Sequence, residues 1–201
     1  MTSVLNGYRD ASSELIPRYE AISSSDLYAH VSRYFPTAPS QIIDIGAGTG
    51  RDAAWFATQG HQVLAVEPVA EFRETGKRLH PAQNIKWLDD ELPKLPKSMA
   101  RGQSFDLVLM SAVWHHLDPV HRQSVMPVLR ALTNRDGHLI MSIRNGPAAP
   151  SRPAFEASPA ETIQLANEHR FDLVFETSTG SVQTSNQKAG VSWTWLVFRQ
   201  K

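Results

Sequence analysis

The chain has 201 residues, of which 41% are hydrophobic, so we expect one domain with a full core of its own. Its 20 Lys and Arg balance 20 Asp and Glu, and the zero net charge argues against nucleic acid or an anionic membrane as the partner. The lack of cysteine excludes disulfides, thiolate nucleophiles and thiolate metal sites.

From residue 40 onward, apolar strands alternate with amphipathic helices, a pattern typical of a parallel sheet with helices on both faces. We predict strands over residues 42–45, 61–67, 85–88, 105–111, 138–143, 171–177 and 191–198. We predict helices over residues 51–59, 68–79, 119–132 and 158–169, the last two with Asp118 and Ser158 as N-caps. Residues 134–137 are predicted as a turn, and residues 89–104, 145–159 and 178–190 as loops. The last two strands suggest a hairpin, so we expect one strand to run antiparallel to the others.

Residues 42–52 form the most informative segment, a buried strand that turns sharply into a helix. Three glycines at alternate positions, from Gly46 to Gly50, suit a backbone that takes positive φ or lies against a ligand. A dinucleotide fingerprint would need its third glycine one residue later, where Arg51 stands. The carboxylate of Asp44 would also repel a pyrophosphate, whereas it suits a cationic ligand with an amino group.

The run from Asp44 to Gly50 closely resembles motif I of the class I S-adenosylmethionine (SAM)-dependent methyltransferases. The resemblance implies SAM as the cofactor and S-adenosylhomocysteine (SAH) as the product, with Asp44 under the methionine amino group. It assigns these residues of the segment to cofactor binding: Asp44, Gly46, Ala47, Gly48, Gly50 and Arg51.

Acidic residues follow the second and third predicted strands. Glu67, before Pro68, stands where an acid in a doubly wound sheet accepts bonds from both ribose hydroxyls, and we assign both residues to the cofactor site. NAD enzymes share this feature, and an interaction of Glu67 with a helix dipole is the alternative. By the resemblance, Asp89 or Asp90 would accept the adenine amino group. We prefer Asp89, the first residue after the strand, and solvated loop charges are the alternative.

Residues 111–117 (SAVWHHL) follow the fourth predicted strand. They resemble the short segment, often ending in His-His-Leu, that lies beneath the sulfonium in this family. The resemblance assigns Ser111 and Ala112 to the cofactor, and Trp114 and His115 to the acceptor pocket. His115 and His116 are candidate catalytic proton acceptors, with structural hydrogen bonding as the alternative.

Arg144 and Asn145 end the fifth predicted strand and are candidate substrate-binding residues. Arg144 could hold a substrate carboxylate bidentately, or it could form a salt bridge with Asp118 or another local acid. Tyr8 and Tyr19 are candidates to lie over the site from the N-terminal segment, with ordinary helix packing as the alternative. Both residues would then help to shape the acceptor pocket.

The resemblance implies an α/β fold with a doubly wound, seven-stranded, mostly parallel sheet and one antiparallel strand, the Rossmann-like methyltransferase fold. Residues 1–39 would form a helical cap over the active site, and residues 40–201 the SAM-binding domain. We expect methyl transfer to O or N of a small-molecule acceptor, without a metal ion, by a monomer or homodimer. The alternatives are a methyltransferase acting on protein or tRNA, a non-catalytic SAM-binding protein, and an NAD-dependent oxidoreductase.

The first twenty residues lack the apolar core of a signal peptide, and no uncharged apolar run is long enough to span a bilayer. We therefore expect a cytoplasmic protein without a membrane partner. Trp193 and Trp195 share one face of the last predicted strand, and we interpret them as core residues.

Overall fold

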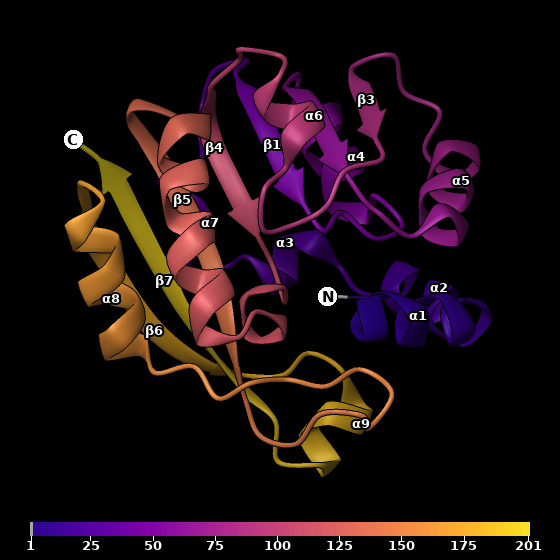
Figure 1. Ribbon diagram of the computed structural model, residues 1–201. Coiled ribbons are helices and arrows are strands. Elements are labelled where there is room, and N and C mark those ends of the chain that lie inside the picture. Colours follow the sequence, from indigo (N-terminus) through magenta and orange to yellow (C-terminus); the bar gives the residue numbers. More distant parts are fainter. Residues whose placement is uncertain (1) are drawn as a thin grey trace.

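The computed structural model describes residues 2–201 and shows a seven-stranded sheet with helices on both faces (Figure 1). The strands are β1 (Gln41–Ile45), β2 (Gln62–Val66), β3 (Ile85–Leu88), β4 (Phe105–Met110), β5 (Thr133–Asn145), β6 (Phe171–Gly180) and β7 (Ser192–Gln200). The α-helices are α1 (Thr2–Asp10), α2 (Ser12–Glu20), α3 (Ser24–Leu27), α4 (Arg51–Thr58), α5 (Ala70–Leu79), α6 (Pro96–Met99), α7 (Pro119–Leu132), α8 (Pro159–Glu168) and α9 (Thr184–Lys188). Two short 3₁₀ helices are η1 (Ser32–Tyr34) and η2 (Trp114–His116).

The strands lie in the order β3-β2-β1-β4-β5-β7-β6. All neighbours from β3 to β5 pair in parallel, and β7 runs antiparallel to both β5 and β6. This arrangement confirms the predicted fold class. The strand order reverses between β1 and β4, and ligands of open α/β sheets bind outside the carboxyl ends of the strands at such a point.

Side chains of β1 alternate between two cores, because successive residues of a strand point to opposite faces of the sheet. Ile43 belongs to a core that includes Leu129 of α7 and Ala166 of α8. Ile42 belongs to a second core, which includes Phe56 of α4. Both faces of the sheet are covered, so the central strands are apolar along nearly their whole length, and this is the pattern from which they were predicted.

Two helices begin at the predicted N-caps. The Asp118 carboxylate accepts the backbone N–H of His121 at 2.8 Å, and the Ser158 hydroxyl accepts that of Glu161 at 3.4 Å. Each cap is followed by proline at the first helical position, where a missing N–H costs nothing. The starts of α7 and α8 are therefore confirmed.

Three loop predictions were wrong. Residues 134–137 belong to β5, because Asn134 donates a side-chain bond to Asp106 of β4 at 2.7 Å and an irregularity in the β4–β5 register absorbs the extra residues. The segment after β3 contains α6, which is tied down by bonds from Ser98 to Asp90. The segment before β7 contains α9, whose Gln187 side chain donates to a neighbouring backbone carbonyl at 2.8 Å.

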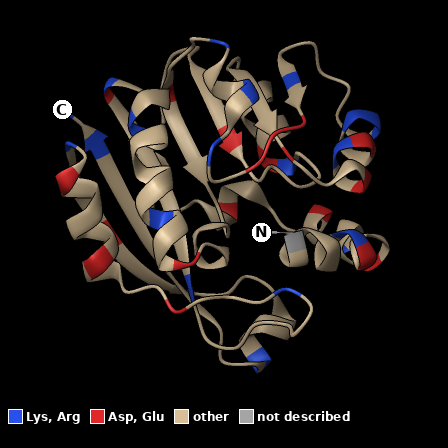
Figure 2. Ribbon diagram, viewed as in Figure 1, with Lys and Arg blue, Asp and Glu red and all other residues tan. Residues whose placement is uncertain are grey.

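Lys and Arg are interspersed with Asp and Glu over the helices seen in Figure 2, in keeping with the zero net charge. Within residues 2–201, no helix combines the length and the apolar character that crossing a membrane requires.

Candidate active site

A cavity of about 520 Å³ opens at the carboxyl ends of the central strands. Its floor is formed by the turns that follow β1, β2 and β4 and by the end of β5. Helices α1 and α2 contribute one part of its wall, and residues 147–152 with the segment around α9 contribute another. The cavity therefore lies at the switch point of the sheet, enclosed in part by segments outside its core.

The turn after β1 is built by glycine. Gly46, Gly48 and Gly50 all have positive φ, between 57° and 78°. A Cβ on Gly50 would also lie 2.5 Å from the ring of Trp87, so a side chain is excluded there by contact as well as by φ. The backbone N–H groups of Gly46 and Ala47 both donate to the carbonyl of the last residue of β2, which anchors the turn to the next strand.

Asp44, in β1, is a buried acid that faces the cavity. The residue is 3% exposed, and its Oδ2 atom has no hydrogen-bond partner among the described residues. Burial, and secondarily the nearby Asp52 carboxylate, raise the pKa of Asp44 well above its usual range. An unpartnered buried acceptor is uncommon in folded proteins, and a donor from a bound ligand would satisfy this one.

Glu67, directly after β2, holds the glycine turn. Its carboxylate accepts the Gly48 N–H at 2.8 Å through Oε2 and the Val69 N–H at 2.7 Å through Oε1. Burial raises its pKa to about 7, although both amide bonds act in the opposite direction. Glu67 and Pro68 both line the cavity, and the carboxylate retains lone pairs for further donors.

Arg51 and Asp52 open α4 and form a buried hub with the N-terminal segment. The Arg51 guanidinium makes two bonds to the Asp52 carboxylate, at 2.8 and 2.7 Å, and a third to the carbonyl of Tyr19 at 3.0 Å. Asp52 also accepts the hydroxyls of Ser24 at 2.6 Å and Tyr28 at 2.7 Å. Arg51 lines the cavity as predicted, but its donors are directed to these internal partners.

The two candidate acids after β3 have different environments. Asp90 is 4% exposed, lines the cavity and accepts both the N–H and the hydroxyl of Ser98, at 2.7 and 2.8 Å. Asp89 is not among the cavity-lining residues and pairs with Arg73 at 3.5 Å and Lys97 at 3.4 Å. The predicted preference for Asp89 does not agree with this geometry, because Asp90, and not Asp89, faces the cavity.

The segment after β4 lies partly in the cavity and partly in the core. Ser111 and Ala112 line the cavity, and the Ala112 N–H donates to the Ser142 hydroxyl at 2.8 Å. Trp114 does not line it, which corrects its assignment to the acceptor pocket. Its ring is fully buried, and its N–H donates to the Thr162 hydroxyl of α8 at 3.0 Å.

The adjacent histidines both face the cavity, with ring centres 4.1 Å apart. His116 Nδ1 lies 2.8 Å from the carbonyl of Pro153, which can only accept, so Nδ1 carries the proton and Nε2 accepts the hydroxyl of Tyr8 at 2.8 Å. His115 Nδ1 has no partner among the described residues. Burial lowers the pKa of both imidazoles, so both are neutral at physiological pH.

Arg144, at the end of β5, lines the cavity, whereas Asn145 turns away and donates to Thr194 at 3.1 Å. The Arg144 guanidinium donates twice to the carbonyl of Pro147, at 3.1 and 2.6 Å. The alternative salt bridge with Asp118 does not form, because that carboxylate caps α7 and bonds the His121 ring at 2.7 Å.

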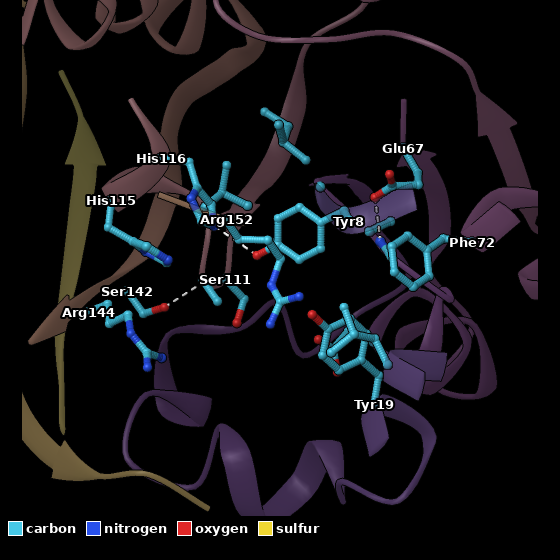
Figure 3. A pocket seen from close by; sticks show the side chains of 18 of the residues that line it. Tyr8, Tyr19, Glu67, Phe72, Ser111, His115, His116, Ser142, Arg144 and Arg152 are labelled. Carbon is cyan, nitrogen blue, oxygen red and sulfur yellow. Dashed lines mark hydrogen bonds between the residues drawn. The ribbon is translucent and has the colours of Figure 1, made fainter. Parts of the chain in front are cut away.

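Aromatic rings cover the cavity from the N-terminal helices. Tyr8 of α1 and Tyr19 of α2 both line it, and their rings contact Phe72 of α5 at centroid distances of 6.2 and 5.8 Å. Figure 3 shows these rings around the middle of the cavity, with Glu67 on one side and Arg144 on the other.

The cavity residues that sequence reasoning missed include Phe72, Arg152 and Trp193. Trp193 is half-buried, and its ring meets the His115 ring edge-on at 5.7 Å. The alternation along β7 predicted which face of the sheet Trp193 lies on, but not that this face borders the cavity. Arg152 comes from the proline-rich loop, which carries no local signal.

Among residues 2–201, no group of three or more His, Asp or Glu side chains is placed to hold a metal ion.

The comparisons with known proteins agree on one family. A family profile described as "Methyltransferase domain" matches residues 43–141. An uncharacterized methyltransferase of Alkaliphilus oremlandii is 26% identical over 100 residues, which are 50% of this chain and 44% of that protein. One from Mycobacterium bovis is 30% identical over 99 residues, 48% of this chain and 37% of that protein. The match therefore spans less than half of the length of these curated relatives.

Solved structures share the fold over most of the chain. A Burkholderia thailandensis 1,6-didemethyltoxoflavin-N1-methyltransferase, with bound 1,6-didemethyltoxoflavin and SAH, superposes with a TM-score of 0.74 at 23% identity, over 100% of this chain and 88% of that one. A Synechocystis magnesium protoporphyrin IX methyltransferase with bound SAM gives 0.67 at 16% identity, over 88% and 77%. The family profile therefore shows a methyltransferase domain, of a family whose cofactor is SAM, over residues 43–141, and the solved structures show that the whole chain has the Rossmann-like methyltransferase fold.

Proposed function

We propose that this chain transfers a methyl group from SAM to an oxygen or nitrogen of a small-molecule acceptor. The observation that carries the proposal is the unpartnered Oδ2 of Asp44, buried beside the glycine turn and facing the cavity. A buried carboxylate without a partner is costly, and an ammonium group from a ligand would satisfy it.

The residues present fit the cofactor. Asp44 would hold the methionine amino group, and Glu67 would accept the ribose hydroxyls with its remaining lone pairs. Asp90, the inward-facing acid of the pair, would lie nearest the adenine, with Asp89 as the alternative. The glycine turn and the backbone of Ala112 would contact the cofactor through the main chain.

Bound SAM would supply an activated methyl group on a positively charged sulfur, which would keep the electron pair of the carbon–sulfur bond when the acceptor atom takes the methyl group. The chain's part is to align the acceptor and to exclude water, which can contribute roughly 7–11 kcal/mol to lowering the barrier. Tyr8, Tyr19 and Phe72 provide the aromatic surface for this positioning.

A hydroxyl or amine acceptor must also lose a proton. His115 and His116 are neutral, so each has a nitrogen that can accept one. Nε2 of His116 is bonded to the Tyr8 hydroxyl, whereas Nδ1 of His115 has no partner within residues 2–201. We therefore assign the proton-accepting role first to His115, with His116 acting through Tyr8 as the second route.

The enclosure of the cavity supports a small acceptor. Residues 1–39 would act as a cap, since α1 and α2 contribute to the wall, and residues 147–152, which contact α1 where Ser151 meets Gly7, would extend that cover. The interspersed surface charge offers no support for a tRNA substrate.

Calorimetric titration with SAH, with NADH as the control, tests the proposal. We expect micromolar SAH binding and no heat from NADH. Absence of SAH binding would refute the cofactor assignment, and NADH binding would favour an oxidoreductase. Tight SAH binding with no methyl transfer from labelled SAM to any small acceptor would identify a non-catalytic SAM-binding protein instead.

A further inference from the structure

We infer that the methyl acceptor carries a carboxylate on a flat aromatic body, recognised by Arg144 and Arg152. This inference rests on the proposed function and adds the chemical class of the acceptor to it. It depends on how the four arginines that line the cavity are partnered.

Two of the four are neutralised by acids of the chain. Arg51 makes a bidentate bond to Asp52, and Arg18 pairs with Glu14 at 2.8 Å. Neither Arg144 nor Arg152 forms an ion pair with any of the described residues. The chain therefore places two uncompensated cations at the cavity, although its overall charge is zero.

Both guanidiniums are held in place by groups that leave their charge intact. Arg144 bonds to the Pro147 carbonyl through Nε and Nη2 and lies 5.5 Å from the centre of the Trp193 ring. Arg152 lies 5.4 Å from the centre of the Tyr8 ring. Arginine has five N–H donors in a planar fork, so each side chain keeps donors for a planar anion.

The charges divide the cavity into two parts. The unpartnered carboxylate of Asp44 and that of Glu67 lie at the ends of β1 and β2, which is the part that suits a cationic cofactor. Arg144 lies across the cavity from Glu67, with Arg152 and Tyr8 between them in Figure 3. Burial, with Arg152 as a further contributor, lowers the pKa of Arg144, and an anion between the two cations would relieve both effects.

The rings set the shape of the ligand. Tyr8 and Trp193 lie beside the two guanidiniums, and Phe72 and Tyr19 continue the apolar surface toward Glu67. A flat ring would pack among them while its carboxylate reaches the arginines, which would also orient the atom that receives the methyl group.

The test measures binding of matched acids and amides to SAH-saturated protein. The probes are 4-hydroxybenzoate with 4-hydroxybenzamide, and indole-3-carboxylate with its amide. Their binding is measured by ligand-observed NMR. We expect at least one acid to bind at least tenfold more tightly than its amide. The variants Arg144→Gln and Arg152→Gln should each remove most of that preference, and Arg144→Lys should retain part of it.

Arg33 provides the control, because it also stacks on rings, those of Tyr34 and Phe175, but does not line the cavity. Arg33→Gln should leave the acid preference unchanged. Thermal unfolding and SAH affinity of each variant are measured alongside, to separate misfolding from loss of the anion site.

Three results would overturn the inference: acids and amides that bind equally, no binding of any probe to the SAH complex, or a loss of SAH affinity in the glutamine variants. The last would place the guanidiniums on the carboxylate of the cofactor itself. Failure of the wild-type chain to bind SAH would instead refute the proposed function. Binding of the acids and amides would then be compared on the protein without SAH, which tests the anion site by itself.

Discussion

Binding of SAH is expected to strengthen as the pH rises, because the cavity contains two buried carboxyl groups whose protonated forms are favoured in the protein alone. Burial raises the pKa of Glu67 to about 7 and that of Asp44 well above its usual range. Hydroxyl donors at Glu67 and an ammonium group at Asp44 would both favour the ionised forms. Binding below neutral pH therefore releases protons.

Glu67 alone sets a lower limit to the effect. A ligand that returns its pKa from about 7 to the ordinary value of 4.5 would bind about 30-fold more weakly at pH 5.5 than at pH 8, which corresponds to about 2 kcal/mol. Stability of the protein alone shows the opposite trend. Because the folded pKa is the raised one, the contribution of Glu67 is fully present below about pH 4.5 and is lost as the pH rises through about 7.

Calorimetry between pH 5.5 and pH 8, in buffers of different ionisation enthalpy, measures both the affinity and the number of protons released. In Glu67→Gln the side chain cannot ionise, so the pH dependence should shrink to the part that Asp44 contributes. Glu71→Gln, which changes an exposed glutamate on α5, is the matched control and should behave as wild type. Equal wild-type affinity at both pH values, without proton release, would refute the reasoning.

Three further substitutions test the site and its support. Asp44→Asn should weaken SAH binding by about 1–3 kcal/mol but raise the free energy of unfolding, and unchanged calorimetric affinity would exclude Asp44 from the site. Gly76→Ala would place a Cβ 2.3 Å from the Trp87 ring, so denaturant unfolding should show a loss of about 1–3 kcal/mol, and an unshifted midpoint would contradict this packing. Tyr8→Phe removes the donor to His116 and should raise the pKa of that imidazole in an NMR titration, whereas an unaltered pKa would argue against the bond.

Features that depend on neighbouring residues in the chain were predictable. The turn from Gly46 to Gly50 and the N-caps Asp118 and Ser158 are set by backbone conformations that few residue types satisfy. The alternation of apolar strands and helices likewise predicted the layered sheet, since burial on both faces demands it.

Features that depend on distant contacts were not predictable. Trp114 is in the core because Thr162, on another helix, receives its N–H. Asp90 rather than Asp89 turns inward because Ser98, on a helix that the sequence did not reveal, binds it. Arg152 reaches the cavity only through the path of its loop, which no local pattern encodes.

The hub at Asp52 limits how far this protein can be treated as modular. Its carboxylate receives Arg51 from its own helix and two hydroxyls, those of Ser24 and Tyr28, from the N-terminal segment. A chimera that takes its N-terminal helices from a relative without those hydroxyls would leave buried acceptors unmatched next to the glycine turn. If that segment is swapped to change the acceptor specificity, the new segment must therefore retain Ser24 and Tyr28, or Asp52 must be replaced at the same time.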